Sequence, residues 1–569
     1  MITHKNNELR LKDINKTITV RGWVHRRRDL GGLIFVDLRD LSGLIQLVFK
    51  PDNKDYQLAQ TLKQEYVISV SGIVREREAK NKDLLTGEIE VDVTSLSILN
   101  TAKQPPIQIG YADNANEETR LKYRYLDLRK KTVNHFLLAR HKIMQSLRTT
   151  LLKAEFLELE TPILGKSTPE GARDFLVPSR LYHGNFYALP QSPQIYKQLY
   201  MISGLEKYFQ FAKCFRDEDL RSDRQLEFTQ LDIEASFYQE EEVISLVEEL
   251  MKNVFLDVLK LEIKAPFKRI SYQEALQKYG SDKPDLRYQL ELEDFDHRPF
   301  NIPFLAAKIT RKLTVNDGAH LTRKELDLLT AEAKKNHGDG LIFLKYQQEK
   351  LTGSILKFIE NEKEFVKDNN LKDGDLLLIS FSDDYEKASL SLGAVRKEIA
   401  SKLALIKPEK LAFLWVVDFP LFEFSEEENR FVARHHPFTQ AKDFRIEPKK
   451  MIARAYDLVL NGYELGGGSI RIHQQQEQEK MFALLGLDKE EVKNRFGFFL
   501  EALSYGTPPH GGIALGLDRL VMLMTNTSNI RDVIAFPKTQ NARDLMLAAP
   551  SEVSSLQLEE LGISFKKEK

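Results

Sequence analysis

Residues 215–232 constrain the fold and the site of this chain more than any other stretch. Apolar and polar residues alternate at both ends of the stretch, and a dense charged run lies between them. Two β-strands joined by a charged loop produce this pattern. The loop brings Arg216, Arg221 and Arg224 within reach of one another, and a guanidinium group can bind a phosphate through two N–H groups. The stretch therefore predicts either a nucleotide-binding hairpin or a solvated hairpin with surface ion pairs.

The length, composition and net charge of the chain limit the class of protein to which it can belong. Its 569 residues predict about three or more domains, and 42% hydrophobic with 29% charged residues fits a soluble protein with packed cores. It contains no apolar run of membrane-spanning length, and its first residues lack the apolar centre of a signal peptide. The single cysteine, Cys214, excludes an intramolecular disulfide and a thiolate metal cluster, which predicts a packed thiol and a cytoplasmic location. A net charge of −1 gives no general attraction to nucleic acid, so any RNA contact must be local.

Three short sequences resemble the motifs of the class II aminoacyl-tRNA synthetases. Phe-Arg-Asp-Glu at 215–218, followed by Glu-Phe-Thr-Gln at 227–230, resembles motif 2. Gly-Gly-Ile-Ala-Leu-Gly-Leu-Asp-Arg-Leu at 511–520 resembles motif 3, and Phe-Leu-Glu-Leu-Glu-Thr-Pro at 156–162 resembles motif 1. The motifs occur in the order that the family has. The resemblance implies an antiparallel-sheet catalytic domain that uses ATP, with motif 1 at the end of a long helix in a dimer interface.

The N-terminal region predicts a small barrel. Residues 17–100 contain five short alternating segments, with a helical segment before the fourth, which is typical of the OB fold. Arg28 is expected in the first turn together with residues 26–27, facing Phe35 and Gln46 on the following strands. A basic turn, an aromatic platform and an amide suit unpaired RNA bases. The alternative is a Phe35 packed in the core beside solvated arginines.

The amino-acid sequence of this predicted barrel is similar to that of the aspartyl-tRNA synthetases. The similar sequences are Trp-Val-His-Arg-Arg-Arg-Asp-Leu-Gly at 23–31 and Phe-Val-Asp-Leu-Arg-Asp at 35–40. The resemblance implies that Phe35 stacks on the central anticodon base and that Gln46 reads it, with Arg28 nearby and Glu90 as a further candidate. Leu30 resembles the type that charges only tRNA-Asp, rather than the type that also charges tRNA-Asn.

Candidate ligands of the amino acid follow motif 1. Residues 166–177 form a charged loop with Gly and Pro, compatible with a plain loop or a lid, and the resemblance makes Glu170 the glutamate that closes over the substrate. Helical spacing places Gln194 and Lys197 on one face after a turn at Ser192. The resemblance assigns Lys197 to the side-chain carboxylate of aspartate. The implied aspartate-binding set is Glu170, Ser192, Gln194, Lys197, Arg216, Asp232, His435 and Arg471, with Asp232 on the ammonium group.

A second dense segment, residues 456–471, carries Asp457, Glu464, three successive glycines and Arg471. Two strand carboxylates with nucleotide phosphates suit Mg²⁺, and glycines admit a flat ligand, whereas two ordinary solvated carboxylates are the alternative. The resemblance assigns the metal to Asp457 and Glu464 and the selection of aspartate to Arg471. Arg-His-His-Pro-Phe-Thr at 434–439 resembles the family's substrate-closing histidine pair, although paired histidines also serve packing roles.

The resemblance also implies the nucleotide contacts. Arg216 would hold the α-phosphate and Arg519, at the start of a helix, the γ-phosphate, which makes these two arginines the candidate catalytic residues. No nucleophile from the protein is required for this chemistry. The implied ATP-binding set is Arg216, Asp217, Glu218, Gln225, Glu464, Gly516, Leu517, Asp518 and Arg519.

The predicted fold class is a multidomain α+β protein. Residues 1–104 form the OB-fold anticodon-binding domain, 105–118 a linker, 119–285 and 414–537 the catalytic domain, and 538–569 a C-terminal extension. A long amphipathic stretch runs from about residue 123 to 154. Residues 286–413 resemble the α/β insertion of the bacterial aspartyl enzymes, named the GAD domain. Gly318-Ala319-His320 falls where its namesake tripeptide would lie but differs in the third residue.

Together these features imply an aspartate–tRNA ligase activity with ATP and Mg²⁺, with L-aspartate, tRNA-Asp and, in the relaxed type, tRNA-Asn as substrates. The family forms homodimers, and neither DNA nor a membrane is an expected partner.

Three alternative functions are distinguished by the sequence features that each would lack. A synthetase for asparagine or lysine would lack the insertion and the Arg471 pocket. An ammonia-dependent asparagine synthetase would lack the barrel, and a non-catalytic RNA-binding relative would lack catalytic residues.

Overall fold

The computed structural model describes residues 2–110, 114–167, 172–300, 302–426 and 428–565. The contacts of the chain divide it into two units, Met1–His135 with Arg543–Ser551, and Phe136–Ala542 with Glu552–Lys569. The domain boundaries given above stay predictions. Within the described ranges, no helix combines the length and the apolar character needed to cross a membrane.

The first unit contains a closed five-stranded barrel. Its strands are β1 (Thr17–Leu30), β2 (Leu33–Arg39), β3 (Leu44–Phe49), β4 (Val67–Glu76) and β5 (Ile89–Asn100), in the order β1, β2, β3, β5, β4. A short helix, α1 (Tyr56–Gln60), precedes the fourth strand. Alternate side chains of a strand point to opposite faces, so Ile34 and Val36 are buried while Phe35 between them is only half-buried. The OB-type prediction is confirmed.

The position predicted for the three arginines at 26–28 is wrong in one respect. They lie inside β1 and not in the first turn, and Arg28 is directly opposite Phe35 on β2. The turn itself is made by Gly31 and Gly32, whose φ angles are 60° and 83°. Two glycines in the left-handed region close a tight hairpin, so the strand remains paired up to the turn.

The long amphipathic stretch is divided into two helices, α3 (Arg124–Asp127) and α4 (Lys131–Lys153), and a short helix, α2 (Glu117–Lys122), precedes it. The buried carboxylate of Asp127 lies at the last break and forms ion pairs with Arg120, Arg124 and Lys130. The predicted apolar stripe of α4 is buried in its C-terminal half, at Ile143, Leu147 and Leu151.

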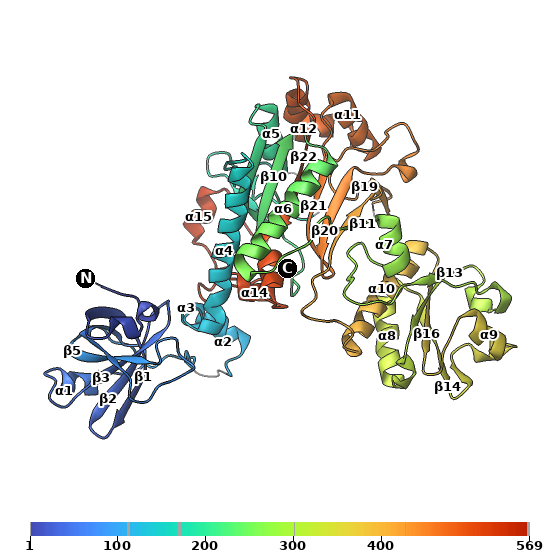
Figure 1. Ribbon diagram of the computed structural model, residues 1–569. Helices are drawn as coiled ribbons and strands as arrows, with labels where there is room; N and C mark the ends of the chain where they lie inside the picture. Colours follow the sequence, from blue (N-terminus) through green and yellow to red (C-terminus); the bar gives the residue numbers. More distant parts are fainter. Residues whose placement is uncertain (1, 111–113, 168–171, 301, 427, 566–569) are drawn as a thin grey trace. The chain divides into compact units, whose positions relative to one another are not determined.

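The second unit is built on an eight-stranded, largely antiparallel sheet. Its order is β11 (Lys268–Ser271), β17 (Phe413–Val417), β20 (Ala455–Leu460), β21 (Tyr463–Ile470), β22 (His510–Gly516), β10 (Glu227–Ser236), β9 (Lys207–Phe215) and β6 (Leu157–Glu158). Strands β9 and β10 confirm the predicted pair joined by a charged loop. Helices α4 and α6 (Glu240–Leu259) lie side by side across one face of this sheet (Figure 1), and Ser146 donates a 2.6 Å hydrogen bond to Asp257 between them.

One face of this sheet is apolar and the other is polar, because apolar and acidic side chains alternate along β10. Leu231 and Ile233 belong to the core formed with α4 and α6. Asp232 and Glu234 point to the other face, where both are completely buried. The polar face of the sheet therefore positions the candidate site.

A five-stranded sheet lies between β11 and β17 in the sequence. Its order is β12 (Glu293–Asp294), β13 (Ile309–Val315), β16 (Leu376–Ser382), β14 (Gly340–Gln347) and β15 (Lys350–Gly353). Leucines of α8 (Arg323–Lys335) and α10 (Tyr385–Lys402) share one core with it, and Phe365 of α9 (Glu362–Asp368) belongs to another. This α/β insertion confirms the helix and strands predicted there. His320 is exposed, whereas Gly318 and Ala319 are buried, so the residue that departs from the tripeptide is the one that packs least.

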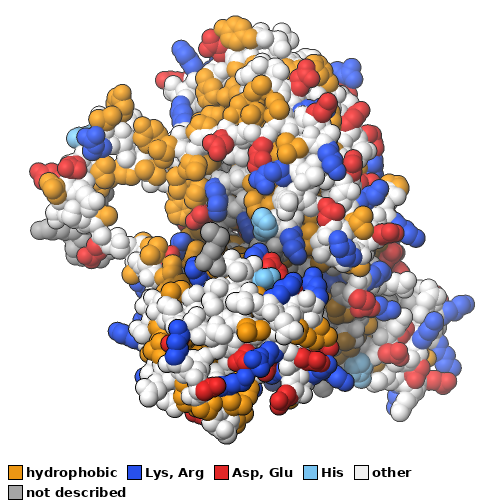
Figure 2. Space-filling view, turned by 60° about the vertical axis from the view of Figure 1, so that its left-hand side comes forward, with side chains coloured by type: hydrophobic (Ala, Val, Ile, Leu, Met, Phe, Trp, Pro, Cys, Tyr) orange, Lys and Arg blue, Asp and Glu red, His pale blue; other side chains and the backbone are white. Residues whose placement is uncertain are grey.

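The surface and the cysteine agree with the composition. In Figure 2, Lys and Arg side chains are interspersed with Asp and Glu over the visible face, as expected for a net charge of −1. Cys214 is completely buried on β9 with its sulfur 3.2 Å from Gln230 Oε1, which confirms the packed thiol.

Candidate active site

A cavity lies over the polar face of the eight-stranded sheet. Its walls come from β10, β20, β21 and β22, from α5 (Gln194–Ile202) and α13 (Leu517–Met524), and from the loop after β9. Among the described residues predicted for the site, Asp217 is exposed and Leu517 is packed in the core, and neither lines the cavity. Glu170 lies outside the described residues. The predicted residues that do line it are Ser192, Gln194, Lys197, Arg216, Glu218, Gln225, Asp232, His435, Asp457, Glu464, Arg471, Gly516, Asp518 and Arg519.

Two buried cations and two buried carboxylates form a paired set, of which Lys197, Arg471 and Asp232 line the cavity and Glu234 lies behind them. Lys197 Nζ lies 3.0 Å from Asp232 Oδ1 and 3.4 Å from Glu234 Oε2. Arg471 donates from Nε to Glu234 Oε1 at 2.8 Å and from Nη2 to Glu234 Oε2 at 3.1 Å. None of the four side chains is more than 2% exposed. Buried charges of this kind are stable only as a paired set.

Glu234 was missed by the sequence analysis. It lies two residues after Asp232 on β10, and residues two apart in a strand share a face. That spacing was a usable signal. Burial opposes the ionisation of Glu234, yet Arg471 and Lys197 lower its pKa below the ordinary value.

The guanidinium group of Arg471 is largely occupied by the protein. Besides its two bonds to Glu234, it donates from Nη1 to His436 Nε2 and to Ser469 Oγ, each at 2.7 Å. Burial and the neighbouring Arg471 cation lower the pKa of His436 well below its ordinary value, so the imidazole is neutral and accepts. With respect to the described residues, one N–H of Nη2 remains for a ligand.

Asp232 presents an acceptor to the cavity. Its Oδ1 receives the Lys197 bond, while Oδ2 is buried with no hydrogen-bond partner among the described residues. Burial raises the pKa of Asp232, and the Lys197 cation opposes that rise. An unpartnered buried carboxylate oxygen is costly by itself and suits a cationic ligand.

Two arginines flank the other end of the cavity. The guanidinium carbon of Arg216 lies 5.1 Å from the ring centre of Phe228, and Arg519 Nη2 lies 3.2 Å from Asp223 Oδ2. The Nε of each arginine is buried and has no partner in the described part of the chain. Of the other hairpin arginines, Arg224 pairs with Glu218 at 3.2 Å, and Arg221 is exposed.

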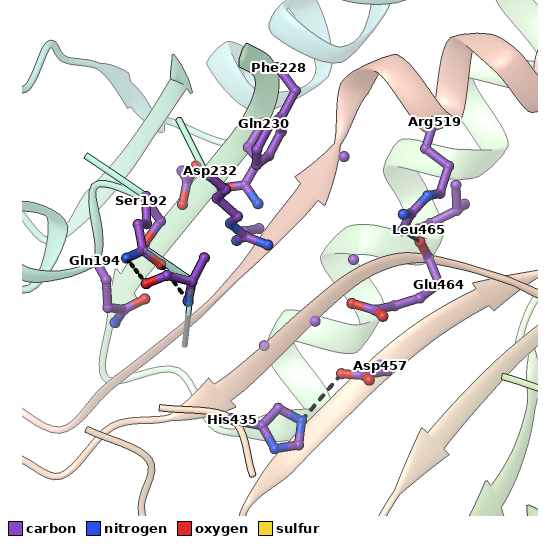
Figure 3. Close-up of a pocket in the computed structure, with 18 of the residues that line it drawn as sticks. Ser192, Gln194, Phe228, Gln230, Asp232, His435, Asp457, Glu464, Leu465 and Arg519 are labelled. Atoms are coloured by element: carbon purple, nitrogen blue, oxygen red, sulfur yellow. Dashed lines mark hydrogen bonds and ion pairs between the residues drawn. The ribbon is translucent and has the colours of Figure 1, made fainter. Parts of the chain in front are cut away.

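Asp457 and Glu464 project from the neighbouring strands β20 and β21 into the same cavity (Figure 3). Burial raises the pKa of Asp457 to about 6, the charge of Glu464 adds to this rise, and His435, whose Nε2 lies 3.5 Å from Asp457 Oδ1, opposes it. No cluster of three or more His, Cys, Asp or Glu side chains able to hold a metal occurs in the described ranges. The two carboxylates therefore fit a cation that takes its other ligands from a bound anion or water.

Two of the residues predicted to bind the nucleotide also form hydrogen bonds within the protein. Asp518 accepts from the backbone N–H of Thr229 at 2.7 Å and from Arg140, so it fastens α13 to β10. Gln225 exchanges two hydrogen bonds, of 2.9 and 3.2 Å, with the backbone of Lys538. Both side chains shape the cavity wall.

The predicted anticodon residues gather on the outer face of the barrel. Arg28 Nη2 donates to Asp37 at 2.9 Å and to Gln46 Oε1 at 3.1 Å, and Gln46 Nε2 donates to Glu90 at 2.8 Å. Arg77 also donates to Gln46 Oε1, at 2.6 Å, a contact that sequence reasoning missed. The amide of Gln46 thus has a fixed orientation.

Comparison with known proteins agrees with this geometry. A family model described as "tRNA synthetases class II (D, K and N)" matches residues 116–540, and one described as "OB-fold nucleic acid binding domain" matches residues 18–99. The "Aspartate--tRNA ligase" of Aster yellows witches'-broom phytoplasma (strain AYWB) is 50% identical over 575 residues, covering 99% of this chain and 98% of that protein. The chain belongs to the aspartate–tRNA ligase family of class II synthetases.

Other members of the aspartate–tRNA ligase family carry a broader name. The "Aspartate--tRNA(Asp/Asn) ligase" of Syntrophomonas wolfei subsp. wolfei is 48% identical over 582 residues and covers 99% of both chains. Among solved structures, the asparaginyl-tRNA synthetase from Pyrococcus horikoshii complexed with asparaginyl-adenylate is 21% identical with a TM-score of 0.59, covering 93% of this chain and 96% of that one. That likeness supports the fold.

The raised pKa of Asp457 predicts how pH acts on the ligand-free protein. The folded state retains this proton up to about pH 6, whereas the unfolded chain loses it near 3.8, so ionisation of Asp457 lowers stability as the pH rises through this window. We expect Asp457→Asn to increase the free energy of unfolding at pH 8 by up to about 3 kcal/mol, and by about half as much at pH 5. Denaturant unfolding in EDTA at both pH values measures this. Asp219→Asn, in the exposed loop, is the control, and an equal effect at both pH values would contradict the assignment.

Proposed function

We propose that the protein is an aspartate–tRNA ligase. It activates L-aspartate with ATP to form aspartyl-adenylate and pyrophosphate, and it transfers aspartate to the 3′ end of tRNA-Asp. The observation that carries the proposal is the buried set of Lys197, Arg471, Asp232 and Glu234, of which the first three line one cavity with Arg216 and Arg519. These charged side chains offer separate binding sites for an ammonium group, a carboxylate and a chain of phosphates.

The amino acid fits the charged floor of the cavity in one orientation. Its ammonium group meets the unpartnered Oδ2 of Asp232, and its side-chain carboxylate meets Lys197 and the remaining N–H of Arg471. Asparagine would place a neutral amide against these cations, and leaving buried charge unpaired costs several kcal/mol, so the site selects aspartate by charge. Ser192, Gln194, His435 and the loop with Glu170 complete the aspartate-binding set.

The two arginines serve the nucleotide. Arg216 binds the α-phosphate and Arg519 the γ-phosphate, so the charge that develops during attack is neutralised in place. Asp457 and Glu464 would hold Mg²⁺, which neutralises phosphate charge when bound. Glu218, Gln225, Gly516 and Asp518 line or shape the same end of the cavity.

The reaction then needs positioning and no protein nucleophile. The α-carboxylate of aspartate attacks the α-phosphorus, a carboxylate–phosphorus bond forms, and pyrophosphate leaves. The terminal ribose hydroxyl of tRNA next attacks the carbonyl carbon of the mixed anhydride, its proton passes to the adenylate phosphate, and AMP leaves. Arg216 contacts the reacting phosphoryl group in both steps, which makes it the central catalytic residue.

We further propose that the barrel reads the anticodon and that the chain forms a homodimer. Phe35, half-buried and opposite Arg28 on the neighbouring strand, serves as the stacking platform, and the oriented amide of Gln46 reads the base. Apolar side chains around motif 1 and at the end of α4 are exposed, and a second copy would cover them: Leu152 (53%), Leu157 (45%), Ile163 (48%) and Leu164 (52%).

Charging of tRNA transcripts tests the activity directly. Purified protein with ATP, Mg²⁺ and L-aspartate should charge tRNA-Asp, and the same reaction with tRNA-Asn distinguishes the strict enzyme from the relaxed one. Charging of neither transcript, with an active control synthetase, would contradict the proposed function. It would favour a non-catalytic RNA-binding protein.

Arg471 carries the specificity prediction. Arg471→Leu should abolish aspartate-dependent ATP–pyrophosphate exchange, and Arg471→Lys, which keeps the charge but not the fork, should lower kcat/KM for aspartate by about 100-fold or more. ATP binding, measured by equilibrium dialysis, should be largely retained. Arg445→Leu, at a side chain that is 89% exposed, is the control. Normal exchange by the Arg471 variants would refute the assignment.

Phe35 carries the prediction for the barrel. Phe35→Ala should raise KM for tRNA-Asp by about 10-fold, because one stacked base contributes about 1–3 kcal/mol, and it should leave aspartate-dependent pyrophosphate exchange unchanged. Leu41→Ala, at an exposed position of the same barrel, is the matched control. An unchanged KM for tRNA in the Phe35 variant would contradict the proposal that Phe35 stacks on an anticodon base.

A further inference from the structure

The insertion between β11 and β17 touches the catalytic part at a defined place. Helix α10 of the insertion packs against α7 (Tyr272–Tyr279), and the backbones meet at Gly280 and Gly393. A Cβ atom on Gly393 would lie 2.0 Å from the carbonyl oxygen of Gly280. One turn later, Arg396 donates to the carbonyl oxygen of Asp285, in the catalytic part, at 3.0 Å. The helix is therefore fixed against the catalytic part by close packing and hydrogen bonds.

The first turn of α10 presents a carboxylate to Arg434, a residue that lines the cavity. Glu386 Oε1 accepts from the hydroxyl of Tyr272 at 2.6 Å and from Arg434 Nη2 at 3.0 Å. Arg434 also donates to the Tyr272 hydroxyl at 2.6 Å, and its guanidinium carbon lies 4.3 Å from the centre of the Tyr272 ring. The Arg434 side chain is 17% exposed, and Glu423 lies 3.7 Å away as a second, weaker partner.

Arg434 is followed directly by the two histidines of the site. His435 Nε2 lies 3.5 Å from Asp457 Oδ1, with its ring edge-on to Phe419 at 4.8 Å, and His436 accepts from Arg471 at 2.7 Å. Three consecutive side chains therefore bind the insertion, a cavity carboxylate and the buried arginine. Displacement of Arg434 would move both histidines, since they share its backbone.

We propose that Glu386 of the insertion is a positioning residue for the aspartate site. By holding Arg434, it fixes the segment that carries His435 and His436 over the cavity. The charge of the pair matters, since a carboxylate that accepts from a guanidinium group forms a stronger hydrogen bond than a neutral acceptor does. This inference rests on the proposed function, because it concerns the affinity of the same cavity for its amino acid.

Glu386→Gln keeps the shape of the side chain and removes its charge, and Glu386→Ala removes both acceptors. In aspartate-dependent pyrophosphate exchange, we expect KM for aspartate to rise by about 10-fold in the alanine variant and less in the glutamine variant. KM for ATP and the thermal unfolding midpoint should change little. Glu398→Gln, at an exposed position of the same helix, is the matched control.

A double-mutant cycle separates positioning from a general loss of structure. If Glu386 acts through Arg434, the double variant Glu386→Gln with Arg434→Gln should raise KM for aspartate no more than Arg434→Gln alone. Additive effects, or equal rises in KM for ATP and aspartate, would overturn the proposal. So would Glu386 variants that match the Glu398→Gln control.

The wild-type protein distinguishes this failure from that of the proposed function. Absence of aspartate-dependent exchange in the wild type would overturn the function itself. An active wild type with unaffected Glu386 variants would overturn only the role of Glu386.

Discussion

Four buried charges, Lys197, Arg471, Asp232 and Glu234, hold the centre of the catalytic site together. Removing one charge from water costs several kcal/mol, so each of these groups depends on the other three. The set is balanced, with two cations and two carboxylates. In the proposed function, the α-carboxylate of aspartate faces the nucleotide, and the ammonium group and the side-chain carboxylate join this set, which preserves the balance. An amino acid with a neutral side chain would add only the ammonium group to the set and would leave an excess positive charge.

The glycines of the sheet make this arrangement sterically feasible. A Cβ atom on Gly512 would lie 2.2 Å from Glu234 Oε2, and one on Gly467 would lie 2.6 Å from Asp457 Oδ1. Side chains at these two positions would occupy the space of the carboxylates. The glycines in motif 3 and in residues 466–468 therefore admit buried acidic side chains as well as a flat ligand. The same glycines therefore allow the backbone of the sheet to approach a ligand closely and leave space for the carboxylates of Glu234 and Asp457.

Several side chains act by orienting others. Asp518 fastens the helix that carries Arg519 to β10, and the neutral imidazole of His436 accepts a hydrogen bond from Arg471. Through Arg434, the insertion reaches the same region. An active site with buried charges needs such support, because a displaced partner leaves a charge unpaired.

The sequence by itself determined the local elements and the residues that face a ligand. Period-2 alternation with a charged interruption predicted the pair β9 and β10, and five alternating segments predicted the barrel. The motifs identified most of the cavity lining, including Lys197, Arg471 and Arg519. These features are readable because strand periodicity and short motifs are properties of neighbouring residues.

Only the tertiary structure decided which partner each side chain takes. Arg471 meets Glu234 across 237 positions of sequence, and Glu386 meets Arg434 across 48. It also decided that Asp518 binds the backbone N–H of Thr229, and that residues 26–28 remain in a strand. The physical reason is that burial and pairing of charge depend on which strands and helices are adjacent, and adjacency between distant segments leaves no periodic signal in the chain.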